Sequence, residues 1–127
     1  MKLNITQILD IPQFYEKVKY QNLPFKISYK LSKLLREVEY HTNFYKENFK
    51  SLLDTYGKKD ENGNFIPTFD NQGIQLVAET SDECYAKIEE LRSLEIELPD
   101  IYFTLEEFEA IQMTPEEVNI IMPFIQV

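Results

Sequence analysis

The sequence predicts a mainly α fold (α+β), in which a long central helix packs with shorter helices beside a small amount of β structure. Residues 25–56 contain neither glycine nor proline, and Pro24 stands just before them, which predicts one long helix over residues 24–56. Residues 64–77 predict a β-hairpin, and residues 95–103 predict a short extended segment. At 127 residues the chain is expected to form a single domain, residues 1–127.

The long helix has apolar residues at intervals of three and four, which predicts one buried stripe. Gly57 is expected to end the helix as a left-handed residue. At 1.5 Å per residue the helix is about 50 Å long, which exceeds the width of a domain of this mass. The stripe is therefore predicted to pack lengthwise against a helix of the same chain or of a partner chain, which favours a homo-oligomer. This oligomer stripe contains Leu31, Leu34, Val38, Tyr45, Phe49 and Leu52.

Shorter helices are expected before and after the long one. Residues 4–20 predict one or two short helices, with Pro12 at a helix start. A further helix is expected to end near Leu94, and two short helices close the chain. Capping boxes, in which a hydroxyl and a carboxylate three residues apart satisfy backbone N–H groups, are predicted for Thr80 with Glu83, Thr104 with Glu107 and Thr114 with Glu117.

Composition indicates a soluble protein of a reducing compartment, which makes the cytoplasm the expected location. No apolar run approaches the 20 residues that a membrane helix requires. Residues 1–14 interrupt their apolar residues with polar ones, so a secretory signal is not expected. The single cysteine, Cys84, cannot form a disulfide within the chain.

The net charge of −9 argues against direct binding to nucleic acid, which requires clustered lysine and arginine. Residues 1–76 carry eleven Lys and Arg against nine Asp and Glu, whereas residues 77–127 carry two against thirteen. The carboxylates of the second part are read either as solvated helix faces or as an acidic face that binds a partner. The candidate acidic partner face consists of Glu95, Glu97, Asp100, Glu106, Glu107 and Glu109.

The sequence contains no recognisable set of catalytic residues, and no catalytic, metal or cofactor site is predicted. The only histidine, His41, lies within the long helix, and Cys84 lies on the apolar face of another, where both are expected to be structural. One His and one Cys are too few for a zinc site within one chain. Residues 60–64 resemble the beginning of a calcium loop, but Phe65 stands where the loop needs glycine and Asn71 where it needs its final glutamate. Residues 58–63 therefore predict a polar turn, in which Asn62-Gly63 supplies the positive φ angle.

Basic residues follow one edge of the long helix at Lys26, Lys30 and Lys33. They are expected to pair with carboxylates of the acidic part, either within a chain or between chains. A separate hypothesis assigns Lys26, Lys30, Tyr29 and Arg36 to a pocket at an oligomer interface that binds a small signalling nucleotide.

Six segments, in this order, resemble a group of small proteins of unknown activity that tailed phages and prophages of Firmicutes encode. The segments are residues 23–31 (LPFKISYKL), 56–65 (YGKKDENGNF), 94–101 (LEIELPDI), 105–109 (LEEFE), 114–117 (TPEE) and 122–125 (MPFI). The resemblance covers roughly residues 23–126. It implies a viral origin and brings no site residues with it.

Together these observations predict a non-enzymatic phage accessory protein that acts by binding a protein, and that inhibits a host factor or a component of antiviral defence. Two alternatives remain: a structural protein of the virion or of its assembly, and an oligomeric sponge for a small signalling nucleotide. A hydrolase that uses a pair of the acidic residues ranks last, because nothing in the sequence singles out such a pair.

Overall fold

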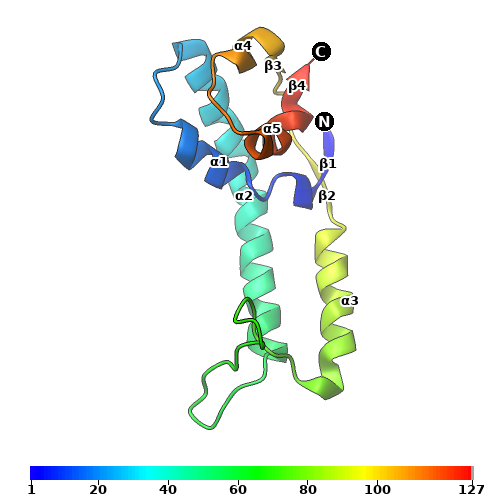
Figure 1. The fold of residues 1–127 in the computed structure, drawn as a ribbon. Coiled ribbons are helices and arrows are strands. Elements are labelled where there is room, and N and C mark those ends of the chain that lie inside the picture. Colours follow the sequence, from blue (N-terminus) through cyan, green and yellow to red (C-terminus); the bar gives the residue numbers. More distant parts are fainter. Residues whose placement is uncertain (127) are drawn as a thin grey trace. The chain divides into compact units, whose positions relative to one another are not determined.

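The computed structural model describes residues 1–126 and shows the predicted mainly α fold (Figure 1). The long helix α2 spans Phe25–Tyr56, one residue shorter than predicted. The other helices are η1 (Ile5–Gln7), α1 (Ile11–Val18), η2 (Ala78–Thr80), α3 (Ser81–Arg92), α4 (Leu105–Glu109), α5 (Pro115–Ile121) and η3 (Met122–Phe124). The strands are β1 (Lys2–Asn4), β2 (Glu95–Glu97), β3 (Phe103–Thr104) and β4 (Ile125–Gln126).

The chain divides into two compact units, and helix α2 contributes to both. Unit 1 comprises Met1–Asn43 and Glu95–Val127, and unit 2 comprises Phe44–Leu94. Burial differs strongly between them. Within residues 1–126 twenty apolar side chains are buried, and only three of these, Tyr56, Cys84 and Leu91, belong to unit 2. The main core of the described chain is therefore in unit 1.

The core of unit 1 forms where one face of α2 meets α1 and the C-terminal segments. In α2 the buried residues recur at intervals of four and three, which places them on one side of the helix. Helix α1 begins with Ile11 and Pro12, as its sequence predicts, and buries Ile11, Phe14 and Val18. The buried residues that α2 supplies to unit 1 are Ile27, Leu31, Leu34, Val38 and Thr42.

Two short sheets hold the ends of unit 1 together. The extended segment near residues 95–103 contains β2, which pairs antiparallel with β1 with Leu3 opposite Ile96. Strand β3 pairs parallel with β4, with Phe103 opposite Ile125. The amino group of Met1 donates a hydrogen bond to the Leu98 backbone oxygen at 2.6 Å. Distant parts of the chain are thus joined edge to edge.

Unit 2 consists of the C-terminal part of α2, the connecting segment and α3, which runs beside α2 (Figure 1). The hairpin predicted over residues 64–77 forms isolated β-bridges but no regular strands. Pro67 pairs with Ile74 in an isolated antiparallel bridge, and the Gln75 N–H donates to the Ile66 oxygen at 2.8 Å. No regular strand forms in residues 57–77 of the described chain, and Pro67, which has no N–H, cannot continue a ladder.

Two predicted helix ends are confirmed and two are wrong. Thr104 and Thr114 both form the complete capping box with a glutamate three residues later. The Thr80 side chain makes no capping hydrogen bond, because Thr80 is the last residue of the 3₁₀ turn η2, which leads directly into α3. Gly57 does not adopt a positive φ angle; among the described glycines only Gly63 does, in the predicted Asn-Gly turn.

Candidate protein-binding face on helix α2

The outward side of α2 in unit 1 carries an alternation of aromatic and basic residues. Phe25, Tyr29, Lys33, Arg36 and Tyr40 follow one another at intervals of four, four, three and four. At 3.6 residues per turn these five residues lie within about 80° of the helix circumference. The same geometry places the buried residues Leu31, Leu34 and Val38 about 180° away. We call this set of five residues the aromatic–basic face.

All three aromatic rings of this face are exposed. Phe25 is 95% exposed, Tyr29 71% and Tyr40 73%. Isolated exposed apolar residues are normal, but three large rings along one helix side form a stripe that burial would stabilise. Tyrosine, phenylalanine and arginine are also the residue types that protein interfaces favour. The composition of the face is therefore typical of a protein-binding surface.

The two cations of the face are exposed and lack an ion-pair partner among residues 1–126. No carboxylate of that part of the chain lies within 4.0 Å of Lys33 or Arg36. Because Arg36 stands between Tyr29 and Tyr40 on the same side of the helix, a charged group and aromatic rings face solvent together. This arrangement suits a partner that offers both apolar surface and carboxylates.

Lys30, on the side of the same helix, has a structural role instead. Its Nζ lies 2.7 Å from Glu107 Oε1 and donates to the Tyr102 backbone oxygen at 3.0 Å. The Nζ also stands 5.7 Å from the centre of the Phe103 ring. The hydrogen bond from Lys30, together with the Thr104 backbone N–H, lowers the pKa of the Glu107 carboxyl. This pair joins α4 to α2 and is not available to a ligand.

The predicted oligomer stripe divides between the two units. Leu31, Leu34 and Val38 are buried in the core of unit 1. They face inward because the apolar side of α2 is covered by the chain's own segments. In unit 2 the remaining residues, Tyr45, Phe49 and Leu52, are half-buried, and the rings of Tyr45 and Phe49 stack with centres 6.0 Å apart. Only this second part of the stripe retains accessible surface.

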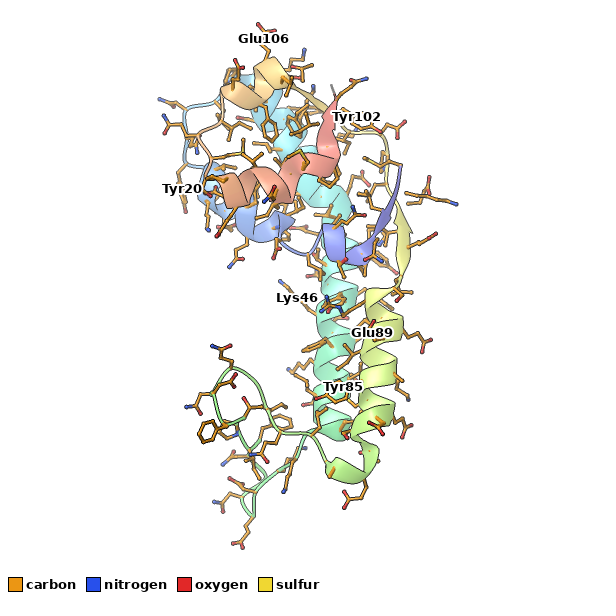
Figure 2. All side chains as sticks on the ribbon, turned by 45° about the vertical axis from the view of Figure 1, so that its right-hand side comes forward. Tyr20, Lys46, Tyr85, Glu89, Tyr102 and Glu106 are labelled. Carbon is orange, nitrogen blue, oxygen red and sulfur yellow. The ribbon has the colours of Figure 1, made fainter. Side chains whose placement is uncertain are left out.

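The predicted acidic partner face is also only partly a surface. Glu95 and Glu97 are exposed on either side of the buried Ile96, as their alternation predicts. Glu106, labelled in Figure 2, and Glu109 are exposed on α4. Asp100 is exposed as well, although its Oδ1 lies 3.1 Å from the Met1 amino group, and Glu97 Oε1 lies 3.7 Å from the same group. Glu107 is the only member that is largely covered, by its pair with Lys30.

The residues assigned to a nucleotide pocket at an oligomer interface lie along α2. Lys30 is paired with Glu107, while Lys26, Tyr29 and Arg36 are exposed along the helix. A hollow of about 770 Å³ exists elsewhere in unit 1, between η1 and α5. It is lined by the carboxylates of Asp10 and Glu116 and by no lysine or arginine, which disfavours phosphate.

Cys84 and His41, each the single residue of its type in the sequence, lie on α3 and α2. Cys84 is fully buried on α3, and burial raises the pKa of its thiol, which disfavours the reactive thiolate. His41 is half-buried on α2, and its ring makes an edge contact with Tyr40 at 5.4 Å between centres. Within residues 1–126, no three side chains of the His, Cys, Asp or Glu type gather as metal ligands do. None of the described helices combines the length and the apolar character that crossing a bilayer requires.

Sequence reasoning missed the outward aromatic residues Phe25 and Tyr40. Large apolar residues along one side of a helix normally indicate a buried face, but α2 carries such residues both on its inward side and on its outward side. The signal was the interleaved Lys33 and Arg36, because a buried stripe does not alternate with unpaired cations.

Comparisons of the chain with protein-family models, with curated proteins and with solved structures gave no match.

Proposed function

We propose that this protein acts by binding another protein through the aromatic–basic face of α2, and that it has no catalytic activity. The observation that carries the proposal is the exposure of Phe25, Tyr29 and Tyr40 on one side of a helix, with Lys33 and Arg36 between them. The opposite side of this helix is anchored in the core of unit 1. A rigid helix that presents aromatic anchors loses little conformational entropy when it binds, which supports affinity.

The partner is a protein with an apolar groove edged by carboxylates. The rings supply contact area and the two cations supply orientation and attraction at long range. A nucleic acid fits less well, because the chain carries a net charge of −9 and the face offers only two cations. Binding to phosphates at physiological salt depends on many such contacts.

The resemblance to small proteins of Firmicutes phages supports a biological setting for this binding. In that setting the protein is a phage accessory protein in the cytoplasm of the host cell, and its partner is a host factor or a component of antiviral defence whose activity it blocks. Occupying an interaction groove of such a factor requires no chemistry from the inhibitor.

Affinity purification from two lysates tests this proposal. Tagged protein is incubated with lysates of infected and of uninfected host cells, and the bound proteins are identified by mass spectrometry. Recovery of the same host protein from both lysates, at a stoichiometry near one, supports inhibition of a host factor. Recovery of phage structural proteins alone, and only after infection, would contradict it and favour a role in the virion or its assembly.

A further inference from the structure

Most apolar side chains of unit 2 are half-buried or exposed. Of its apolar side chains only Tyr56, Cys84 and Leu91 are buried, although the unit contains 51 residues. Two helices alone bury too little surface to offset the conformational entropy of ordering them. The half-buried apolar residues of this unit are Tyr45, Phe49, Leu52, Leu53, Phe65, Ile66, Ile74, Leu76, Val77 and Ile88.

A groove of about 340 Å³ runs between α2 and α3 on one side of unit 2. Phe44 and Leu94 stand at its apolar part and are 42% and 37% exposed. Leu52 and Leu91 also line it. The polar residues that line it are Asn48, Ser51, Lys87 and Glu90.

We propose that this groove is the interface at which a second copy of the same chain docks, forming a two-fold dimer whose paired helices make a four-helix bundle. Two antiparallel helix pairs commonly combine in this way, with the apolar side of each pair at the centre. The copies would cover Phe44 and Leu94, which the monomer leaves partly in water. None of the five residues of the aromatic–basic face lines this groove.

The charges of the groove fit a second copy because they are self-complementary. Lys87 and Glu90 are three residues apart on α3 and both line the groove. In a two-fold interface, residue i of one copy faces residue j of the other, and j faces i. A two-fold axis that crosses α3 between these positions places Lys87 of each copy opposite Glu90 of the other. The ion pair is then made twice.

The first test compares the mass of the protein with that of two groove variants by sedimentation velocity and light scattering. The wild type is expected to have twice the mass of one chain. Phe44→Glu and Leu94→Glu each place a charge in the groove and are expected to give monomers with unchanged helix content, because both side chains are already partly exposed. Tyr85→Glu, on α3 outside the groove lining and labelled in Figure 2, is the matched control and is expected to remain dimeric.

A charge reversal identifies the orientation of the dimer. Glu90→Lys places lysines opposite each other twice, and the dimer dissociation constant is expected to rise at least about tenfold. Lys87→Glu is expected to act likewise, and the double variant Lys87→Glu/Glu90→Lys is expected to restore dimerisation. Lys87 also lies 5.7 Å from the Tyr56 ring centre, so circular dichroism of each variant checks that its fold is intact.

A wild-type protein that is monomeric at all concentrations would overturn the proposal, and so would a Leu94→Glu variant that dimerises like the wild type. Failure of the double variant to recover, with its fold intact, would exclude the two-fold pairing of Lys87 with Glu90 and overturn the proposed dimer. The partner-binding proposal is tested separately, because substitutions at Tyr29 and Arg36 are expected to leave the dimer unchanged.

Discussion

Lys30 Nζ lies 2.7 Å from Glu107 Oε1, which joins the long helix α2 to the short helix α4 within unit 1. Both side chains are largely covered, and the same carboxylate oxygen accepts the backbone N–H of Thr104 at 3.1 Å. The second oxygen, Glu107 Oε2, is buried without a hydrogen-bond partner among the described residues. The carboxylate therefore depends on Lys30 for much of its stabilisation.

Removing the lysine is expected to destabilise unit 1. In Lys30→Met the Glu107 carboxylate stays largely buried but loses a hydrogen-bond donor. The free energy of unfolding is therefore expected to fall by about 1–2 kcal/mol. Lys33→Met removes an exposed lysine without an ion-pair partner in the described chain and is expected to change stability by less than about 0.5 kcal/mol. Urea denaturation measures both values, and equal effects of the two substitutions would contradict the role of the pair.

The same pair is expected to contribute to acid sensitivity. Because the folded protein holds the pKa of Glu107 below its usual value, the stabilisation is fully present above the unfolded pKa and is lost as pH falls through the folded pKa. Unfolding free energies measured from about pH 6 down to about pH 3 are expected to fall less steeply for Glu107→Gln than for the wild type. Parallel pH profiles of the two proteins would show that Glu107 titrates normally.

Gly57 is expected to be required for the close approach of the connecting segment to α2. A Cβ at this position would lie 2.5 Å from the Leu53 backbone oxygen and 2.8 Å from an atom of the Phe65 ring. Gly57→Ala is therefore expected to cost about 1–3 kcal/mol through displaced packing. Gly73→Ala is the control, because its Cβ would approach no other atom closer than 3.8 Å.

Hydrogen exchange measures this effect locally. In Gly57→Ala the amide of Lys58, which donates to the Gln75 oxygen at 2.7 Å, is expected to exchange faster than in the wild type. Protection at Lys58 that is unchanged in Gly57→Ala would show that the segment accommodates the methyl group.

Cys84 is expected to report the opening of unit 2. Its thiol is fully buried and its pKa is raised by burial, so a thiol reagent is expected to modify the native protein slowly and the urea-unfolded protein at once. If the dimer proposed for unit 2 forms, Leu94→Glu is expected to react faster than the wild type. Rapid modification of the native wild type would contradict the burial of this residue.

Local sequence patterns predicted the helices because they depend on near neighbours. The absence of glycine and proline after Pro24 predicted α2, and the spacing of Thr and Glu predicted three capping boxes, of which those at Thr104 and Thr114 form. The pairing of β1 with β2 joins Leu3 to Ile96 and leaves no signal in either short segment. Distant pairings of this kind depend on the packing of the whole unit.

The candidate site was harder to predict, because aromatic residues serve both cores and interfaces. Phe25 and Tyr29 show the same four-residue spacing as the buried Ile27 and Leu31, and the sequence alone does not tell which side α1 and the C-terminal segments cover. The exposure of these rings identifies the outward side. The ion pair of Lys30 likewise distinguishes a structural lysine from Lys33, which has the same residue type and a similar position.

Binding of a protein partner by the aromatic–basic face is tested by comparing partner recovery between two variants. The double variant Tyr29→Ala/Arg36→Ala removes one ring and one cation of the face, and Tyr85→Ala removes an exposed ring from α3. Each tagged protein is incubated with the same host lysate, and bound partner is quantified by mass spectrometry. The double variant is expected to recover at least about tenfold less partner, because such anchor residues each contribute more than about 1 kcal/mol, whereas Tyr85→Ala is expected to recover it fully. Undiminished recovery by the folded double variant would contradict binding through this face.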